Sequence, residues 1–93
     1  MHIGALTVTL RVCEAASLKD KRHVLKSIVD GARRRFNVAI AEVDHLDAHE
    51  LATLGIACVS NSNRHANSIL DHVLSHLEAN PQIIVEEAHL EIL

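Results

Sequence analysis

Aromatic side chains are almost absent from this sequence, which contains no Trp, no Tyr and a single Phe, Phe36. Sheets that bind RNA by base stacking need exposed aromatic rings. We therefore expect no base stacking on a sheet of this protein. Cysteine is also scarce, and Cys13 and Cys58 are too few for a disulfide framework or a four-thiolate metal site. We expect both to be reduced thiols.

Long apolar runs are missing as well. The chain is 48% hydrophobic, which predicts a folded protein, but charged residues interrupt every run before it reaches the length that crosses a bilayer. The N-terminus passes directly into alternating apolar residues, without the basic start and continuous apolar centre of a secretory signal. We expect one domain over residues 1–93, located in the cytoplasm, with no membrane partner.

Signatures of catalysis are absent too. An acylphosphatase-like site needs an Arg in the turn after the first strand, where this chain reads Cys13-Glu14-Ala15-Ala16-Ser17. A copper chaperone needs a CxxC motif at the same turn, and Cys13 stands alone. We therefore expect no enzyme, no catalytic residue and no cofactor.

Eight histidines raise the question of a metal site. His72 and His76 are four residues apart, but they lack the Glu of an HExxH motif and an obvious third ligand. The other group lies in a polar segment and consists of Asp44, His45, Asp47 and His49. Because such residues are common in any polar loop, we expect solvated histidines and no bound metal.

Hydrophobic periodicity predicts six elements. Residues 2–12 alternate as a strand does, with Leu6, Val8 and Leu10 on one side. Ser17 and Asp20 have the spacing of a helix cap, and the apolar residues that follow predict a helix over 18–35. Strands are predicted over 37–44, 53–60 and 83–93. A second helix is predicted between the capping residues 61–62 and the stop signal at 80–81.

The resulting order, βαββαβ, predicts the fold. Two amphipathic helices can cover only one face of four strands, and right-handed crossovers favour the split βαβ arrangement. We expect an α+β, ferredoxin-like sandwich in which two helices lie on one face of a four-stranded antiparallel sheet. The open face would consist mainly of small, weakly apolar residues, namely Ile3, Ala5, Thr7, Thr9, Ala39, Ala41, Val43, Ala57 and Val59. We expect a second copy to cover it and form a homodimer, the alternative being a half-polar sheet surface in a monomer.

Positive charge is concentrated in the first predicted helix. Seven of the nine Lys and Arg residues lie there against Asp20 and Asp30, which gives this helix +5 in a chain of net charge −3. This segregation predicts a surface that binds a polyanion. The candidate nucleic-acid or anion-binding residues are Lys19, Arg22, Lys26, Arg33, Arg34 and Arg35 in this helix and Arg64 in the second. We also expect the end of the first helix to meet the start of the second, where free N–H groups favour anions or are simply capped.

These features favour a non-enzymatic adaptor that binds RNA or a ribosomal surface through the basic helix 18–35, by phosphate contacts that do not read sequence. Two alternatives remain open. One is an ACT-like dimer that senses a small ligand, with Gly55 and the chain near Asp44 at the site. The other is an interaction protein without a nucleic-acid role, whose helix surface is solvated and has pairs among Lys26, Asp30 and Arg34.

Several segments resemble one family. The matching residues are Ser17-Leu18-Lys19-Asp20-Lys21-Arg22, Phe36-Asn37-Val38, Ala41-Glu42-Val43-Asp44, Leu54-Gly55-Ile56-Ala57 and Val59-Ser60-Asn61. Together they are similar to the YlxP-like family of uncharacterised small bacterial proteins. The resemblance implies a ferredoxin-like fold and a cytoplasmic protein, encoded in some bacteria beside genes for translation initiation and ribosome maturation. It implies no established activity.

Overall fold

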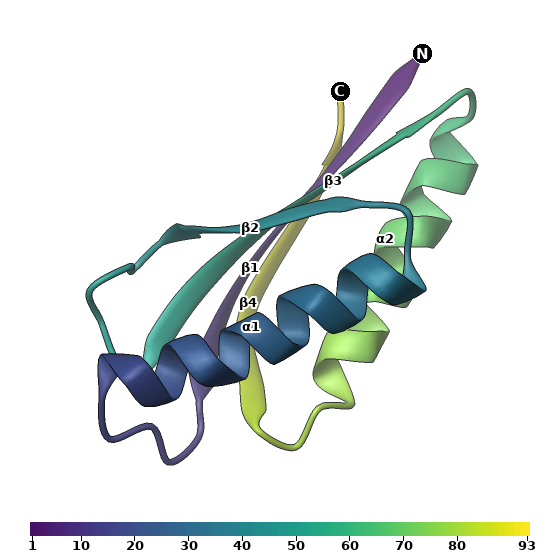
Figure 1. Ribbon diagram of the computed structural model, residues 1–93. Coiled ribbons are helices and arrows are strands. Elements are labelled where there is room, and N and C mark those ends of the chain that lie inside the picture. The colour runs from purple at the N-terminus through teal and green to yellow at the C-terminus, as the bar shows by residue number, and fades with distance from the viewer.

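The computed structural model describes all 93 residues and contains six regular elements. They are β1 (His2–Val12), α1 (Leu18–Arg35), β2 (Ala39–Asp44), β3 (Leu51–Ser60), α2 (Asn63–Glu78) and β4 (Ile83–Ile92). Both helices lie on the same side of the sheet, as Figure 1 shows. The predicted ferredoxin-like α+β fold is confirmed.

The four strands form one antiparallel sheet in the order β2-β3-β1-β4. Two strands that are connected by a helix, such as β1 and β2, are therefore not adjacent in the sheet, because another strand lies between them. The chain ends lie side by side (Figure 1), and Ile3 and Leu93 exchange two backbone hydrogen bonds of 3.2 and 2.7 Å. This pairing ties both termini to the sheet.

Side-chain caps start both helices. The Ser17 hydroxyl accepts a hydrogen bond from Asp20 N–H, and the Ser62 hydroxyl accepts one from His65 N–H. The Asp20 carboxylate in turn accepts from Ala16 N–H at 3.1 Å, which fixes the turn before α1. α1 ends at Phe36 because the backbone there becomes extended. Neither helix is long and apolar enough to cross a membrane.

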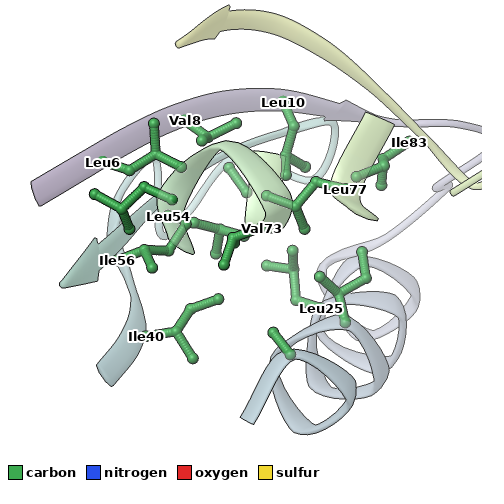
Figure 2. Close-up of a cluster of buried hydrophobic side chains, with 14 of the residues drawn as sticks. Leu6, Val8, Leu10, Leu25, Ile40, Leu54, Ile56, Val73, Leu77 and Ile83 are labelled. Carbon is green, nitrogen blue, oxygen red and sulfur yellow. The ribbon is translucent and has the colours of Figure 1, made fainter. Parts of the chain in front are cut away.

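The core lies between the sheet and the two helices. It joins Leu6, Val8 and Leu10 of β1 to side chains from every other element, and Figure 2 shows this cluster. α2 approaches β1 closely at Gly4, where an added Cβ would lie 2.8 Å from Leu70 Cδ1. A side chain at this position would therefore require the buried Leu70 to move.

The strand boundaries differ slightly from the predicted ranges. β2 starts at Ala39 rather than at residue 37, and β3 starts at Leu51 rather than at residue 53. Leu51 and Ala52 continue the pairing with β1, so the polar connection is shorter than expected. Cys13 and Cys58 are free thiols.

A β-bulge in β4 changes its alternation. The register with β1 shifts between Thr9 and Leu10, so Val85 pairs with Leu10 while Glu87 pairs with Thr9. Glu86 is the additional residue. As a result Ile83 and Val85 face the helices, as do Ala88, Leu90 and Ile92 further along the strand.

Candidate nucleic-acid interface

Five of the predicted cations lie along the solvent-facing side of α1, and we call them the basic face: Lys19, Arg22, Lys26, Arg33 and Arg34. All five are exposed. Their spacing places them opposite the buried side of the helix, which carries Leu25, Ile28 and Ala32. The amphipathic pattern that drives α1 onto the sheet therefore also gathers its positive charge on the outside.

Few carboxylates neutralise the basic face. Lys26 forms an ion pair of 2.9 Å with Asp30, as the i,i+4 spacing predicts. Lys19, Arg22 and Arg34 form no ion pair. The predicted contact between Asp30 and Arg34 is therefore not formed. Four of the five cations therefore have no carboxylate partner, and of these only Arg33 contacts another group of the protein, a backbone carbonyl.

Arg33 has a second role at the edge of the sheet. Its Nη2 donates a 2.9 Å hydrogen bond to the carbonyl oxygen of Ile40 in β2. β2 is an edge strand, so this carbonyl faces away from its neighbour in the sheet. Arg33 thus satisfies an edge carbonyl and links α1 to β2.

The charge of this surface is reflected in the titration of Asp30. A hydrogen bond from Lys26 holds the pKa of Asp30 below its ordinary value of 3.8, although desolvation opposes the change. The positive charges of Lys26, Arg33 and Arg34 act in the same direction. The surface around Asp30 therefore favours a negative charge.

The prediction that the end of α1 meets the start of α2 is wrong. Arg35 and Phe36 instead lie against the second half of α2, where the Phe36 ring is 5.5 Å from the ring of His76. His76 is about 3.5 turns beyond the start of α2. Arg64, in the first turn of α2, is therefore separated from the arginines of α1, and the two ends form no common anion pocket.

Lys21 is a buried polar centre that the sequence analysis did not identify, because a lysine in a basic helix is expected to be exposed. Its side chain is fully buried. Nζ donates hydrogen bonds of 2.8 and 3.0 Å to the carbonyl oxygens of His45 and Leu51. It also lies 2.9 Å from Glu42 Oε2, at an angle that makes this contact an ion pair rather than a directed hydrogen bond.

The polar connection between β2 and β3 is held by local contacts. His45 has a positive φ of 60°, and its Nδ1 lies 3.0 Å from Thr53 Oγ1. Glu50 pairs with Arg11 at 3.1 Å. The acidic connection therefore forms no ion pair with the basic face, since Glu50 pairs with Arg11 and otherwise lies 3.7 Å from the ring of its neighbour His49. No group of three His, Cys, Asp or Glu side chains is arranged to hold a metal ion.

The open face of the sheet contains a shallow hollow of about 520 Å³. It is lined mainly by apolar residues of β1, β2 and β3, among them Ala5, Ala41 and Ala57, and at one side by Arg33 of α1. An added Cβ at Gly55 would lie 3.0 Å from Val43 Cγ1, so this glycine leaves room for Val43. The open face is nevertheless not free of charge, because the register places Arg11 of β1 and Glu87, His89 and Glu91 of β4 on it.

Comparison with known proteins places the chain in a family. A family model described as "Protein of unknown function (DUF503)" matches residues 3–90. The chain is also 38% identical over 81 residues to the "Uncharacterized protein YlxP" of Bacillus subtilis (strain 168), with 87% of this chain and 88% of that protein covered. The YlxP-like resemblance is thereby confirmed over nearly the whole fold. This chain therefore belongs to the DUF503 family of proteins of unknown function.

Proposed function

We propose that this protein is a non-enzymatic cytoplasmic adaptor that binds RNA, free or on a ribosomal surface, through the basic face of α1. The observation that supports it most is that Lys19, Arg22 and Arg34 are exposed and form no ion pair in a chain of net charge −3. Asp30 neutralises Lys26, so the remaining cations give this side of α1 a net positive charge that is available to an external anion.

The shape of the basic face suits contacts with phosphates. From Lys19 to Arg34 the helix rises about 22 Å, at about 1.5 Å per residue. Side chains cannot read the deep, narrow major groove of an A-form helix, so contacts from α1 would go to the RNA backbone. Such contacts position RNA without selecting a sequence, and their strength falls with salt.

The open sheet face is the proposed contact between two copies. Val43 and Val59 are 56% and 64% exposed there, beside the hollow lined by alanines. Apolar surface of this kind is commonly covered by a partner. Since both helices lie on the other side of the sheet (Figure 1), a homodimer joined by its open faces would leave most of the basic face free on each outer side. Only Arg33, which also lines the hollow, would border the contact.

The hollow also favours a second candidate function, the ACT-like binding of a small ligand between two copies. Eight of its eleven lining residues are hydrophobic, so its ligand would be largely apolar. Ligand binding in this hollow would be insensitive to salt, unlike RNA binding by the basic face. Salt dependence therefore separates the two functions.

The test is a titration of labelled ribosomal RNA fragments with the protein at several salt concentrations. We expect affinity to fall linearly with salt on logarithmic axes, with a slope of about −0.7 for each phosphate contacted on a single strand. The triple variant Lys19→Glu, Arg22→Glu and Arg34→Glu should lose this binding. These exposed side chains have no partner in the fold, so the triple variant should have the same free energy of unfolding as the parent protein.

A matched pair of single variants controls for net charge. Arg34→Gln and Gln82→Glu each change the charge by −1, but only the first lies on the basic face. We expect Arg34→Gln to weaken binding and make the salt slope shallower, and Gln82→Glu to do neither. Unchanged RNA affinity in the triple variant, or an equal effect of both single variants, would refute the proposed role of α1.

A further inference from the structure

We infer that the groove between the end of α1 and the second half of α2 holds one unpaired base of a single-stranded RNA segment. This inference rests on the proposed function and narrows it, because it selects single strands over duplexes. The groove has a volume of about 470 Å³, within the range of small-molecule sites. Its lining consists of Arg35, Phe36, His72, Ser75, His76 and Ala79.

The groove gathers the planar groups that stack on nucleobases. It contains the only phenyl ring of the protein, Phe36, which is half-buried. The ring of His76 meets it edge to face at 5.5 Å and 71°, and the guanidinium carbon of Arg35 lies 5.8 Å from its centre. Aromatic rings and Arg guanidinium planes are the surfaces on which proteins stack unpaired bases.

The polar groups of the groove complement a nucleotide. His72 and His76 lie on the same side of α2, one turn apart, and both imidazoles offer hydrogen-bonding nitrogens. Ser75 adds a hydroxyl, and Arg35 adds a fixed positive charge. No carboxylate lines the groove, so the guanidinium of Arg35 is its only fixed side-chain charge.

The groove is continuous with the basic face. Arg34 is the residue before Arg35, and the helical turn of about 100° per residue directs Arg35 away from the basic face and toward α2. A strand whose phosphates follow α1 would therefore reach the groove at the C-terminal end of the helix. A duplex could follow the same phosphates, but its bases are paired and stacked and cannot enter.

The experiment compares a single-stranded RNA with a duplex of the same number of phosphates, with 2-aminopurine in the single strand as a fluorescent reporter of stacking. We expect Phe36→Leu to weaken single-strand binding at least about fivefold, as the loss of one stacked base does, and to change duplex binding less than about twofold. The change of 2-aminopurine fluorescence on binding should also be lost. Arg34→Gln should weaken both RNAs by a similar factor.

Arg35→Lys provides a second variant that does not touch the core. It keeps the charge of this exposed residue but removes the planar guanidinium, so it too should weaken single-strand binding selectively. If the ratio of single-strand to duplex affinity were unchanged in both variants, the proposal that the groove binds a base would be refuted, while the proposed role of the basic face would stand. Absence of RNA binding by the parent protein would overturn both.

Discussion

At the scale of single residues, Lys21 shows why the exposed side of a helix cannot be identified from charge alone. Lys21 lies three residues after Leu18 and four before Leu25, which is the spacing of the buried side of α1. Its burial depends on Glu42 and on two carbonyl oxygens that lie 24 and 30 residues further along the chain. Periodicity predicts the position of such a residue, whereas its partners follow only from the assembled fold.

Removing the Lys21 charge should therefore be costly. In Lys21→Met, Glu42 would lose its ion-pair partner and two carbonyl oxygens would lose their donor. We expect the free energy of unfolding to fall by about 3 kcal/mol. Denaturant unfolding followed by circular dichroism measures this change.

The control is Lys19→Met, which removes the same charge from an exposed residue two positions earlier and should change stability by no more than about 0.5 kcal/mol. In the double variant Lys21→Met with Glu42→Leu, much of the loss should be recovered, because no buried charge is left unpaired. Equal stability of Lys21→Met and the parent would show that the buried contacts contribute nothing.

At the scale of elements, local patterns predicted all six segments and the packing of two helices on one face of the sheet, because each element has a strongly apolar side, but they did not predict where the end of α1 meets α2. The same patterns did not predict the bulge of β4, since nothing in residues 83–92 alone identifies the unpaired residue. That residue, Glu86, is set by the pairing with β1 and by a 3.1 Å ion pair to Arg11 on the neighbouring strand. The position of the C-terminal end of α1 against the second half of α2 likewise depends on packing rather than on sequence spacing.

Packing between elements is tightest at Gly4. An added Cβ there would lie 2.8 Å from Leu70 Cδ1 and 3.1 Å from Cys58 Sγ. We expect Gly4→Ala to lower the free energy of unfolding by about 1–3 kcal/mol, because α2 has to shift or Leu70 has to leave its preferred conformation. Gly31→Ala is the matched control.

Gly31 lies within α1 and has open space around its Cα, so the same substitution there should stabilise the protein by about 0.5–1 kcal/mol. Both variants are measured by the same unfolding experiment. If Gly4→Ala were as stable as Gly31→Ala, the close approach of α2 to β1 would not constrain the fold.

At the scale of the whole molecule, charge and apolar surface are placed on different sides. The basic face points outward from the helical layer, while the open sheet face carries the apolar hollow and, at β4, the acidic side chains Glu87 and Glu91. RNA that approached the open face would meet this acidic strand. A second copy can therefore occupy the open face while Lys19, Arg22, Lys26 and Arg34 stay available to RNA, with Arg33 alone bordering both surfaces, and the two proposed interactions are compatible in one assembly.

This separation predicts that assembly and RNA binding can be uncoupled by substitution. Ala41 is exposed in the hollow, so Ala41→Glu would bury a charge in the contact between copies and should convert a dimer to a monomer. Asn63→Glu adds the same charge at the start of α2 and should leave the dimer intact. Light scattering after gel filtration measures the mass of each variant. In RNA titrations at equal salt, the Ala41→Glu monomer should still bind RNA through α1. Its apparent affinity for long RNAs should be lower than that of the dimer, because the monomer has only one basic face. A parent protein that is monomeric at high concentration, or an Ala41→Glu variant that stays dimeric, would contradict the open face as the contact.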